Sequence, residues 1–149
     1  MTSPDWVLDT NVLISAALSR QGSPYALVQQ VLAHARLVFS EPTFEELRTR
    51  LYRPKFDRYI SLDMRERVLR DLSACAMWVD IDGHGAWSRD ADDDKFIATA
   101  LQVPGAILVS GDQDLLTAPA LAGLRILTPA QALTAFEGHS APPDKIGGP

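Results

Sequence analysis

The chain has 149 residues, the usual length of one domain, and its 46% hydrophobic and 22% charged residues are typical of a globular protein. No apolar run is long enough to span a membrane as a helix, which excludes a helical integral membrane protein. The first residues show no basic segment followed by an apolar one, so export is not indicated and we expect a cytoplasmic protein.

The cysteine and histidine content limits the metal chemistry that the chain can carry out. Cys75 is the only cysteine, so neither an internal disulfide nor a cysteine-rich zinc site is possible. It lies in an apolar helical pattern, and we expect it to be a small core residue. The three histidines show no ligand spacing. Any metal ligands must therefore be oxygens, which favours Mg²⁺ or Mn²⁺.

The first predicted strand ends in a polar group. The apolar pair Val7-Leu8 runs into Asp9, Thr10 and Asn11, a pattern typical of a buried parallel strand that presents an acid at its C-terminal end. Open α/β sheets build their sites at such ends. Thr10 and Asn11 would then be hydrogen-bonding neighbours that orient Asp9. The alternative is an ordinary turn, because all three residues favour turns and caps.

The remaining elements alternate between helix and strand along the chain. Caps, prolines and apolar residues at helical spacing predict helices over residues 23–32, 40–53, 62–76, 92–102 and 129–137. Short apolar runs predict strands over residues 37–39, 77–79, 106–109 and 125–127. In the third helix, the expected buried residues are Met64, Val68, Leu69 and Leu72.

This alternating order predicts an α/β fold in which a mainly parallel sheet has helices on both faces. We expect residues 1–137 to form a single domain. Residues 138–149 are rich in glycine and proline and show no periodicity, so we expect a disordered tail there.

The net charge of −5 conceals a strong asymmetry along the chain. Residues 48–70 hold eight cations against three anions, whereas residues 80–94 hold six aspartates against one arginine. A basic run can be no more than a solvated helix face. A protein that binds divalent cations in an acidic pocket and a polyanion on a basic surface nearby would need both features.

Four acids fall where one edge of the predicted sheet is expected: Asp9, Glu46, Asp94 and Asp112. Four carboxylates in one pocket repel one another unless cations neutralise them or their pKa values rise. A metal site is the simplest resolution, and paired metal ions suit phosphodiester hydrolysis. The alternative for Glu46 is a solvated ion pair with Arg50, and Asp114 is the alternative to Asp112.

The same residues carry a family resemblance. Asp9-Thr10-Asn11, the segment from Ser40 to Glu46, Asp94 before Ile97-Ala98, and Ser110-Gly111-Asp112 occur in an order that resembles the PIN-domain nucleases. The likeness extends from about Trp6 to Phe136 and is greatest to the VapC-like toxins of bacterial toxin-antitoxin pairs.

This resemblance implies a PIN-like three-layer α/β/α sandwich and an endoribonuclease that depends on Mg²⁺ or Mn²⁺. It also implies a homodimer that a cognate antitoxin silences. The acids Asp9, Glu46, Asp94 and Asp112, or Asp114 as the fourth, would bind metal, with Thr10, Asn11 and Ser110 supporting them. The cations expected to hold RNA or a partner are Arg48, Arg50, Arg53 and Lys55.

Two other functions remain open from the sequence. One is a non-catalytic PIN-like scaffold that keeps its acids, and the other is a nuclease that acts in RNA processing or on DNA. The four intact acids favour catalysis over a scaffold, and the short chain leaves no room for the extra domains of processing nucleases.

Overall fold

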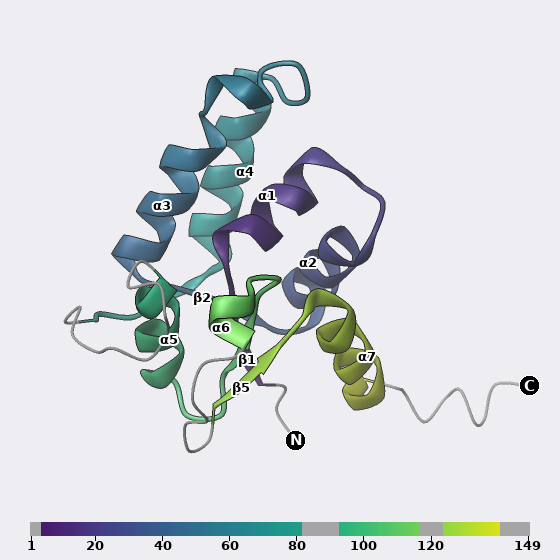
Figure 1. Ribbon diagram of the computed structural model, residues 1–149, viewed down its shortest axis with the longest axis vertical. Helices are drawn as coiled ribbons and strands as arrows, with labels where there is room; N and C mark the ends of the chain where they lie inside the picture. The colour runs from purple at the N-terminus through teal and green to yellow at the C-terminus, as the bar shows by residue number, and fades with distance from the viewer. Residues whose placement is uncertain (1–3, 82–92, 117–123, 141–149) are drawn as a thin grey trace, which may run out of the picture.

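The fold is built around a five-stranded parallel sheet in the strand order β3-β2-β1-β4-β5 (Figure 1). The computed structural model describes residues 4–81, 93–116 and 124–140. The strands are β1 (Asp5–Leu8), β2 (Arg36–Phe39), β3 (Met77–Trp78), β4 (Ile107–Val109) and β5 (Arg125–Leu127). All adjacent pairs are parallel, which confirms the predicted sheet.

Helices cover both faces of this sheet and form the outer layers of a three-layer arrangement. They are α1 (Thr10–Leu18), α2 (Ser23–His34), α3 (Glu41–Leu51), α4 (Leu62–Cys75), α5 (Asp94–Leu101), α6 (Gln113–Leu116) and α7 (Pro129–Ser140), with a 3₁₀ turn η1 (Pro54–Phe56). Among the described residues, no helix is both long and apolar enough to cross a bilayer.

Alternate residues of the central strands face opposite layers, as the period of two in a strand requires. Trp6 and Leu8 of β1 enter a core with the apolar sides of α1, α2, α3, α4 and α7. Val7 enters a second core with Phe96 and Ile97 of α5. The strands β1, β2 and β4 are therefore apolar on both faces, which explains the hydrophobic runs over residues 6–8, 37–39 and 107–109.

Helices α1 and α6 are the described helices that the sequence analysis does not predict, and α1 is the longer of the two. Val12, Leu13 and Ile14 are all buried, because the helix packs against α2 and α3. Only Asn11 and Ser15 form an exposed polar stripe on this helix, and the apolar run Val12-Leu13-Ile14 between them resembles a continuing strand. Its start is nevertheless marked, since Asp9 is its N-cap.

Helix α4 corrects three expectations. Met64 is 40% exposed rather than buried, whereas Arg65 beside it is only 1% exposed. The Arg65 guanidinium donates to Asp57 at 3.0 Å and lies over the Tyr52 ring, so it is not part of a basic surface. Cys75 is exposed and is not a core residue. The long aliphatic stem of an arginine fills apolar space, and this explains why it replaces the methionine in the core.

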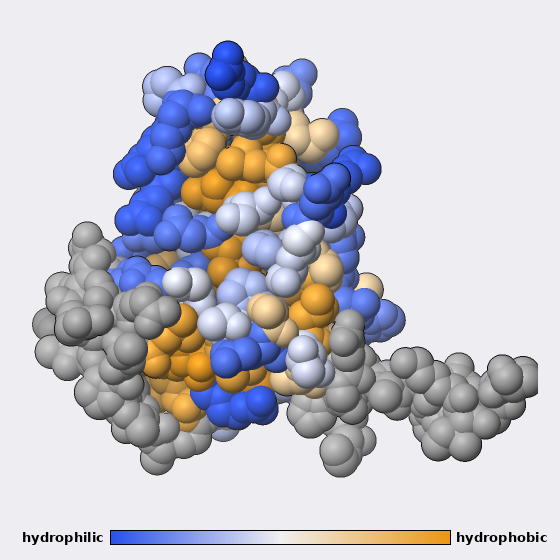
Figure 2. Space-filling model, turned by 45° about the vertical axis from the view of Figure 1, so that its right-hand side comes forward, coloured by the Kyte–Doolittle hydropathy of each residue, from blue (hydrophilic) through white to orange (hydrophobic). Residues whose placement is uncertain are grey.

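A groove of about 500 Å³ separates α1 and α2 from α4. Leu13 and Ala17 line one side, and Ile60, Met64 and Val68 line the other. Figure 2 shows hydrophobic surface in the upper half of the view, at the height of α1 and α4, bordered by hydrophilic side chains. Met64 is thus exposed where it lines a larger apolar depression.

The other predicted strands and helices are present, with ends shifted by a few residues. Helix α5 begins at Asp94, two residues later than expected, and α7 continues to Ser140. Most of residues 80–89, for which the sequence favours an irregular connection, lies outside the described residues, as do residues 141–149 of the expected tail.

Truncation of a central core residue should destabilise this fold strongly. Leu108 of β4 is fully buried, so we expect Leu108→Ala to lower the free energy of unfolding by about 2–5 kcal/mol, measured by urea denaturation. Leu62→Ala is the matched control, since Leu62 is 63% exposed, and it should change stability by less than about 0.5 kcal/mol. Equal effects of the two substitutions would contradict the assigned core.

Candidate active site

The strand order places a crevice at the C-terminal ends of β1 and β4. The chain runs from β1 outward to β2 and β3, then crosses to the other side of β1 to form β4 and β5. Such a reversal point leaves a crevice beyond the strand ends, where α/β proteins bind ligands. Asp9 follows β1 directly, and Ser110 follows β4 directly. The two residues therefore meet at the reversal point, although 101 positions separate them in the chain.

Two hydrogen bonds hold the Asp9 carboxylate, which is only 3% exposed. Its Oδ1 accepts from the backbone N–H of Val12 at 2.9 Å, as a helix N-cap does. Its Oδ2 accepts from the hydroxyl of Ser110, which is itself buried. The positive end of the α1 dipole also favours a negative charge there. The first turn of α1 and the serine after β4 thus fix the orientation of the Asp9 carboxylate.

The surroundings of Asp9 raise the pKa of its carboxyl above the ordinary value of 3.8. Burial is the largest cause, because it disfavours the charged form. The hydrogen bonds from Ser110 and Val12 oppose this change, whereas the nearby charges of Asp112 and Glu46 add to it. Three of the predicted acids therefore interact electrostatically beyond the ends of β1 and β4, and we call this group of acids the acidic pocket.

Glu46 reaches this pocket from the middle of α3 and is surrounded by hydrogen-bond donors and cations. Its Oε2 accepts from the hydroxyl of Thr10, the residue after Asp9. Its Oε1 lies 2.6 Å from the Lys95 ammonium and 3.4 Å from the Arg50 guanidinium. The expected pair with Arg50 is present, but Glu46 also faces the pocket.

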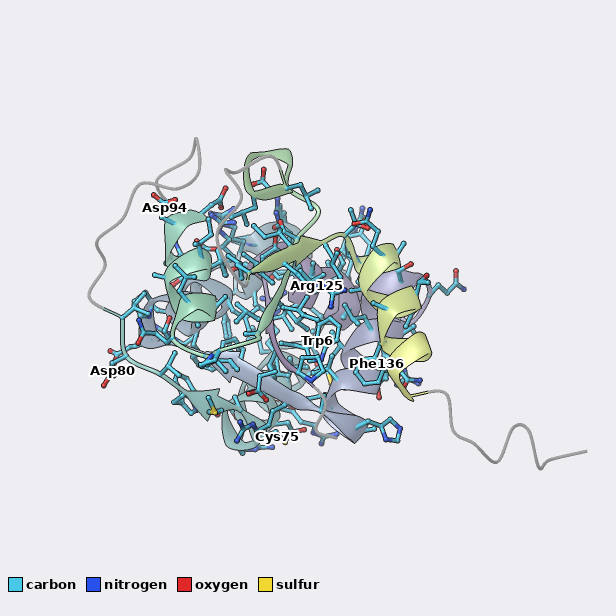
Figure 3. The ribbon with its side chains drawn as sticks, turned by 90° about the horizontal axis from the view of Figure 1, so that it is seen from below. Trp6, Cys75, Asp80, Asp94, Arg125 and Phe136 are labelled. Carbon is cyan, nitrogen blue, oxygen red and sulfur yellow. The ribbon has the colours of Figure 1, made fainter. Side chains whose placement is uncertain are left out.

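Asp94 is the first residue of α5 and is 8% exposed. Figure 3 shows it at the upper edge of the view, whereas Cys75 lies at the lower edge. A buried hydroxyl pair ties this helix to α3, since Ser40 and Thr99 lie 2.8 Å apart. Thr99 also donates to the Lys95 carbonyl at 2.7 Å, which secures the first turn of α5.

The remaining predicted site residues take different positions. Asp112 is half-buried, and its N–H donates to the Ser110 hydroxyl at 2.8 Å. Asn11 is exposed, and Ser110 rather than Asn11 holds Asp9. The side chain of Asp114 lies outside the described residues. Within the described parts of the chain, no three acidic, histidine or cysteine side chains are close enough together to hold one metal ion.

The basic residues after Glu46 divide into two groups. Arg50 lies one turn from Glu46 and pairs with it, so it belongs to the pocket. Arg48 pairs instead with Glu45 and lines a separate depression with residues of α4. Arg53 and Lys55 are exposed beyond the end of α3, where Lys55 lies over the Phe56 ring.

Comparison with known proteins identifies the family. The sequence model of the PIN domain matches residues 5–114 of the chain. The chain belongs to the PIN-domain family. The uncharacterized protein MJ1680 of Methanocaldococcus jannaschii is 28% identical over 113 residues, which cover 74% of this chain and 72% of that protein. The predicted family is confirmed.

Solved structures share the PIN fold at low sequence identity. VapBC2 from Rickettsia felis, bound to a promoter DNA fragment, matches with a TM-score of 0.56 at 13% identity, covering 83% of this chain and 98% of that one. The PIN domain of RRP44 from T. brucei matches with a TM-score of 0.54 at 13% identity, covering 94% of this chain and 84% of that one. PAE2754 from Pyrobaculum aerophilum matches with a TM-score of 0.53 at 13% identity, covering 91% of this chain and 90% of that one.

Lys95 and Thr99 are residues of this PIN domain that the sequence analysis did not select. Lys95 follows the aspartate run directly, and this position beside Asp94 was the available signal. Thr99 stands one turn later in the helix and gives no signal in the sequence, because nothing in the local pattern indicates its partner Ser40 on another element. Both roles depend on the packing of α5 against α3.

The raised pKa of Asp9 predicts a pH-dependent gain in stability for Asp9→Asn. A folded-state pKa above the unfolded value means that ionisation of Asp9 destabilises the folded state, so stability falls as the pH rises from 3.8 through the folded pKa. Asparagine keeps the N-cap without the charge. We expect the variant to exceed the wild type in free energy of unfolding near neutral pH, with a difference that shrinks toward about pH 4.

Urea denaturation across this pH range measures the effect. The matched control is Asp63→Asn, which removes an exposed carboxylate from the first turn of α4 and should change stability by less than about 0.5 kcal/mol. A variant that is less stable than the wild type at neutral pH would show that the charge of Asp9 is not destabilising.

Proposed function

We propose that this PIN domain is a divalent-metal-dependent endoribonuclease that hydrolyses RNA phosphodiesters, and that it is the toxin of a type II toxin-antitoxin pair. The observation that carries the proposal is the buried Asp9 carboxylate at the reversal point of the sheet, with Asp112 and Glu46 as charged neighbours. A protein keeps such an acid, at a cost in stability, where its charge has a function. The family to which the chain belongs is one of nucleases.

The donor set fits Mg²⁺ or Mn²⁺ by its chemistry. Asp9, Glu46, Asp94 and Asp112 offer only carboxylate oxygens, which these hard cations prefer. A divalent cation held there supplies Lewis-acid chemistry, which lowers the pKa of water and stabilises negative charge on a phosphate. Asp114 remains a second candidate for the fourth ligand.

The protein's own residues then perform the positioning. Ser110 and the Val12 N–H hold Asp9 in one direction, and Thr10 does the same for Glu46. Arg50 is the cation best placed to contact an RNA phosphate beside the acids, because it lies next to Glu46. Arg53 and Lys55 continue the positive charge beyond the end of α3, where backbone contacts bind RNA without selecting a sequence.

The toxin assignment also implies partners. The fold similarity to VapBC2 supports an antitoxin partner, and the family resemblance supports a homodimer. We propose both for this chain. A small reading frame next to this gene would be the first place to find the antitoxin.

The nuclease assignment predicts metal-dependent cleavage that Asp9→Asn abolishes. We expect the purified protein to cleave a mixed RNA pool with Mg²⁺ or Mn²⁺ and not with EDTA. The variant should be at least about 10²-fold slower, since a metal ion contributes several kcal/mol to transition-state stabilisation. Gel analysis of the RNA products measures the rates.

Asp63→Asn, prepared identically, controls for the loss of any aspartate and should cleave at the wild-type rate. Unchanged cleavage by Asp9→Asn would refute the assigned site. Absence of cleavage in every metal, together with absence of metal binding by calorimetry, would instead support the non-catalytic scaffold.

The toxin assignment predicts growth arrest. Induced expression of the chain in a bacterial host should slow growth, because the cleavage of cellular RNA stops protein synthesis. Asp9→Asn should remove the effect, and co-expression of the adjacent reading frame should restore growth. Normal growth despite RNA cleavage in vitro would favour a processing nuclease over a toxin.

A further inference from the structure

Lys95 is a cation that the fold places against an acid of the proposed metal site. Its ammonium lies 2.6 Å from Oε1 of Glu46, and both side chains are largely buried, at 20% and 12% exposure. An ion pair this close and this shielded from water is stronger than a pair on the surface. The contact joins α5 to α3 at the level of the acidic pocket.

The backbone of the first turn of α5 is anchored by hydrogen bonds, whereas the Lys95 ammonium is held by its ion pair with Glu46. The Lys95 carbonyl accepts a hydrogen bond from Thr99, and Thr99 is in turn bonded to Ser40 at the start of α3. The ammonium lies 5.7 Å from the centroid of the Phe96 ring and is carried on a flexible four-carbon stem. The backbone of α5 can therefore stay in place while rotation about the side-chain bonds of Lys95 moves its ammonium to another position.

Both oxygens of Glu46 are already engaged. Thr10 donates to Oε2, while Lys95 and Arg50 share Oε1. A hydroxyl can share a carboxylate oxygen with a metal ion, because it carries no charge. A lysine ammonium cannot remain at 2.6 Å from the same oxygen without strong repulsion of a divalent cation. Arg50 is farther away, at 3.4 Å, so Lys95 is the closer competitor.

We infer that Lys95 is a positioning residue that acts as an internal counter-ion: it neutralises Glu46 in the metal-free protein and leaves this carboxylate when a divalent cation binds. The inference rests on the proposed function, because it assigns Glu46 to the metal site. It predicts that the protein binds metal more weakly than its acids alone would allow. It also predicts that binding frees one lysine ammonium in the pocket.

Calorimetric titration with Mn²⁺ alone, in the absence of RNA, tests the first consequence. Lys95→Met keeps a flexible aliphatic side chain and removes the charge, so its Kd for Mn²⁺ should be about tenfold lower than that of the wild type. Lys95→Arg restores the charge and should return the Kd to within about twofold of the wild type. Arg48→Met removes an equal charge from the Glu45 pair outside the pocket and should change the Kd by less than about twofold.

Reductive methylation of the wild-type protein tests the second consequence. The chain has three lysines, so each labelled ammonium can be followed by mass spectrometry. Addition of Mg²⁺ should accelerate labelling of Lys95 several-fold and leave labelling of the exposed Lys55 unchanged. A purely structural Lys95 would give neither this change nor tighter metal binding by Lys95→Met.

The outcomes separate this inference from the proposed function. If Lys95→Met binds Mn²⁺ no more tightly than the wild type, or if no protein binds Mn²⁺, the counter-ion role is refuted. Metal-dependent RNA cleavage by the wild type decides the nuclease assignment independently. A wild type that cleaves RNA while Lys95→Met shows unchanged affinity would retain the nuclease and reject the counter-ion.

Discussion

The burial of Asp9 at the reversal point of the sheet is the constraint on which the rest of the site depends. The carboxylate lies at the end of the central strand, caps the helix that follows, and accepts from a serine on the neighbouring strand. Its burial is unfavourable for an ionised group, and the hydrogen bonds from Ser110 and Val12 only partly offset this. The sheet edge, α1 and the β4 loop are thus organised around one acid.

The same requirement for compensation explains the arrangement around Glu46. A carboxylate at 12% exposure needs donors or cations, and the fold supplies Thr10, Lys95 and Arg50. These partners come from three helices, so the contact also fixes how α1, α3 and α5 meet. Neutralisation of charge and positioning of the acids are therefore achieved by the same residues.

Much of the sheet could be predicted because its strands are short apolar segments followed by polar residues. β1, β2 and β4 are apolar on both faces, and this follows directly from a parallel sheet between two helical layers. Helix α1 was not predicted, since its burial reduces the polar stripe to Asn11 and Ser15 and leaves an apolar run that resembles a strand. The sequence analysis counted Arg65 among the cations of a basic surface. Its burial depends on contacts with Asp57 and Tyr52, and local periodicity does not predict these contacts.

The sequence by itself determined which chemical groups are available: carboxylates at the ends of predicted strands and helices, without cysteine or histidine ligands. Local patterns report such groups because strand ends and helix caps have characteristic compositions. The tertiary structure alone decided which groups meet. Ser110 reaches Asp9 across 101 positions, and Lys95 reaches Glu46 from another helix. These contacts depend on strand order and helix packing, which are properties of the whole chain.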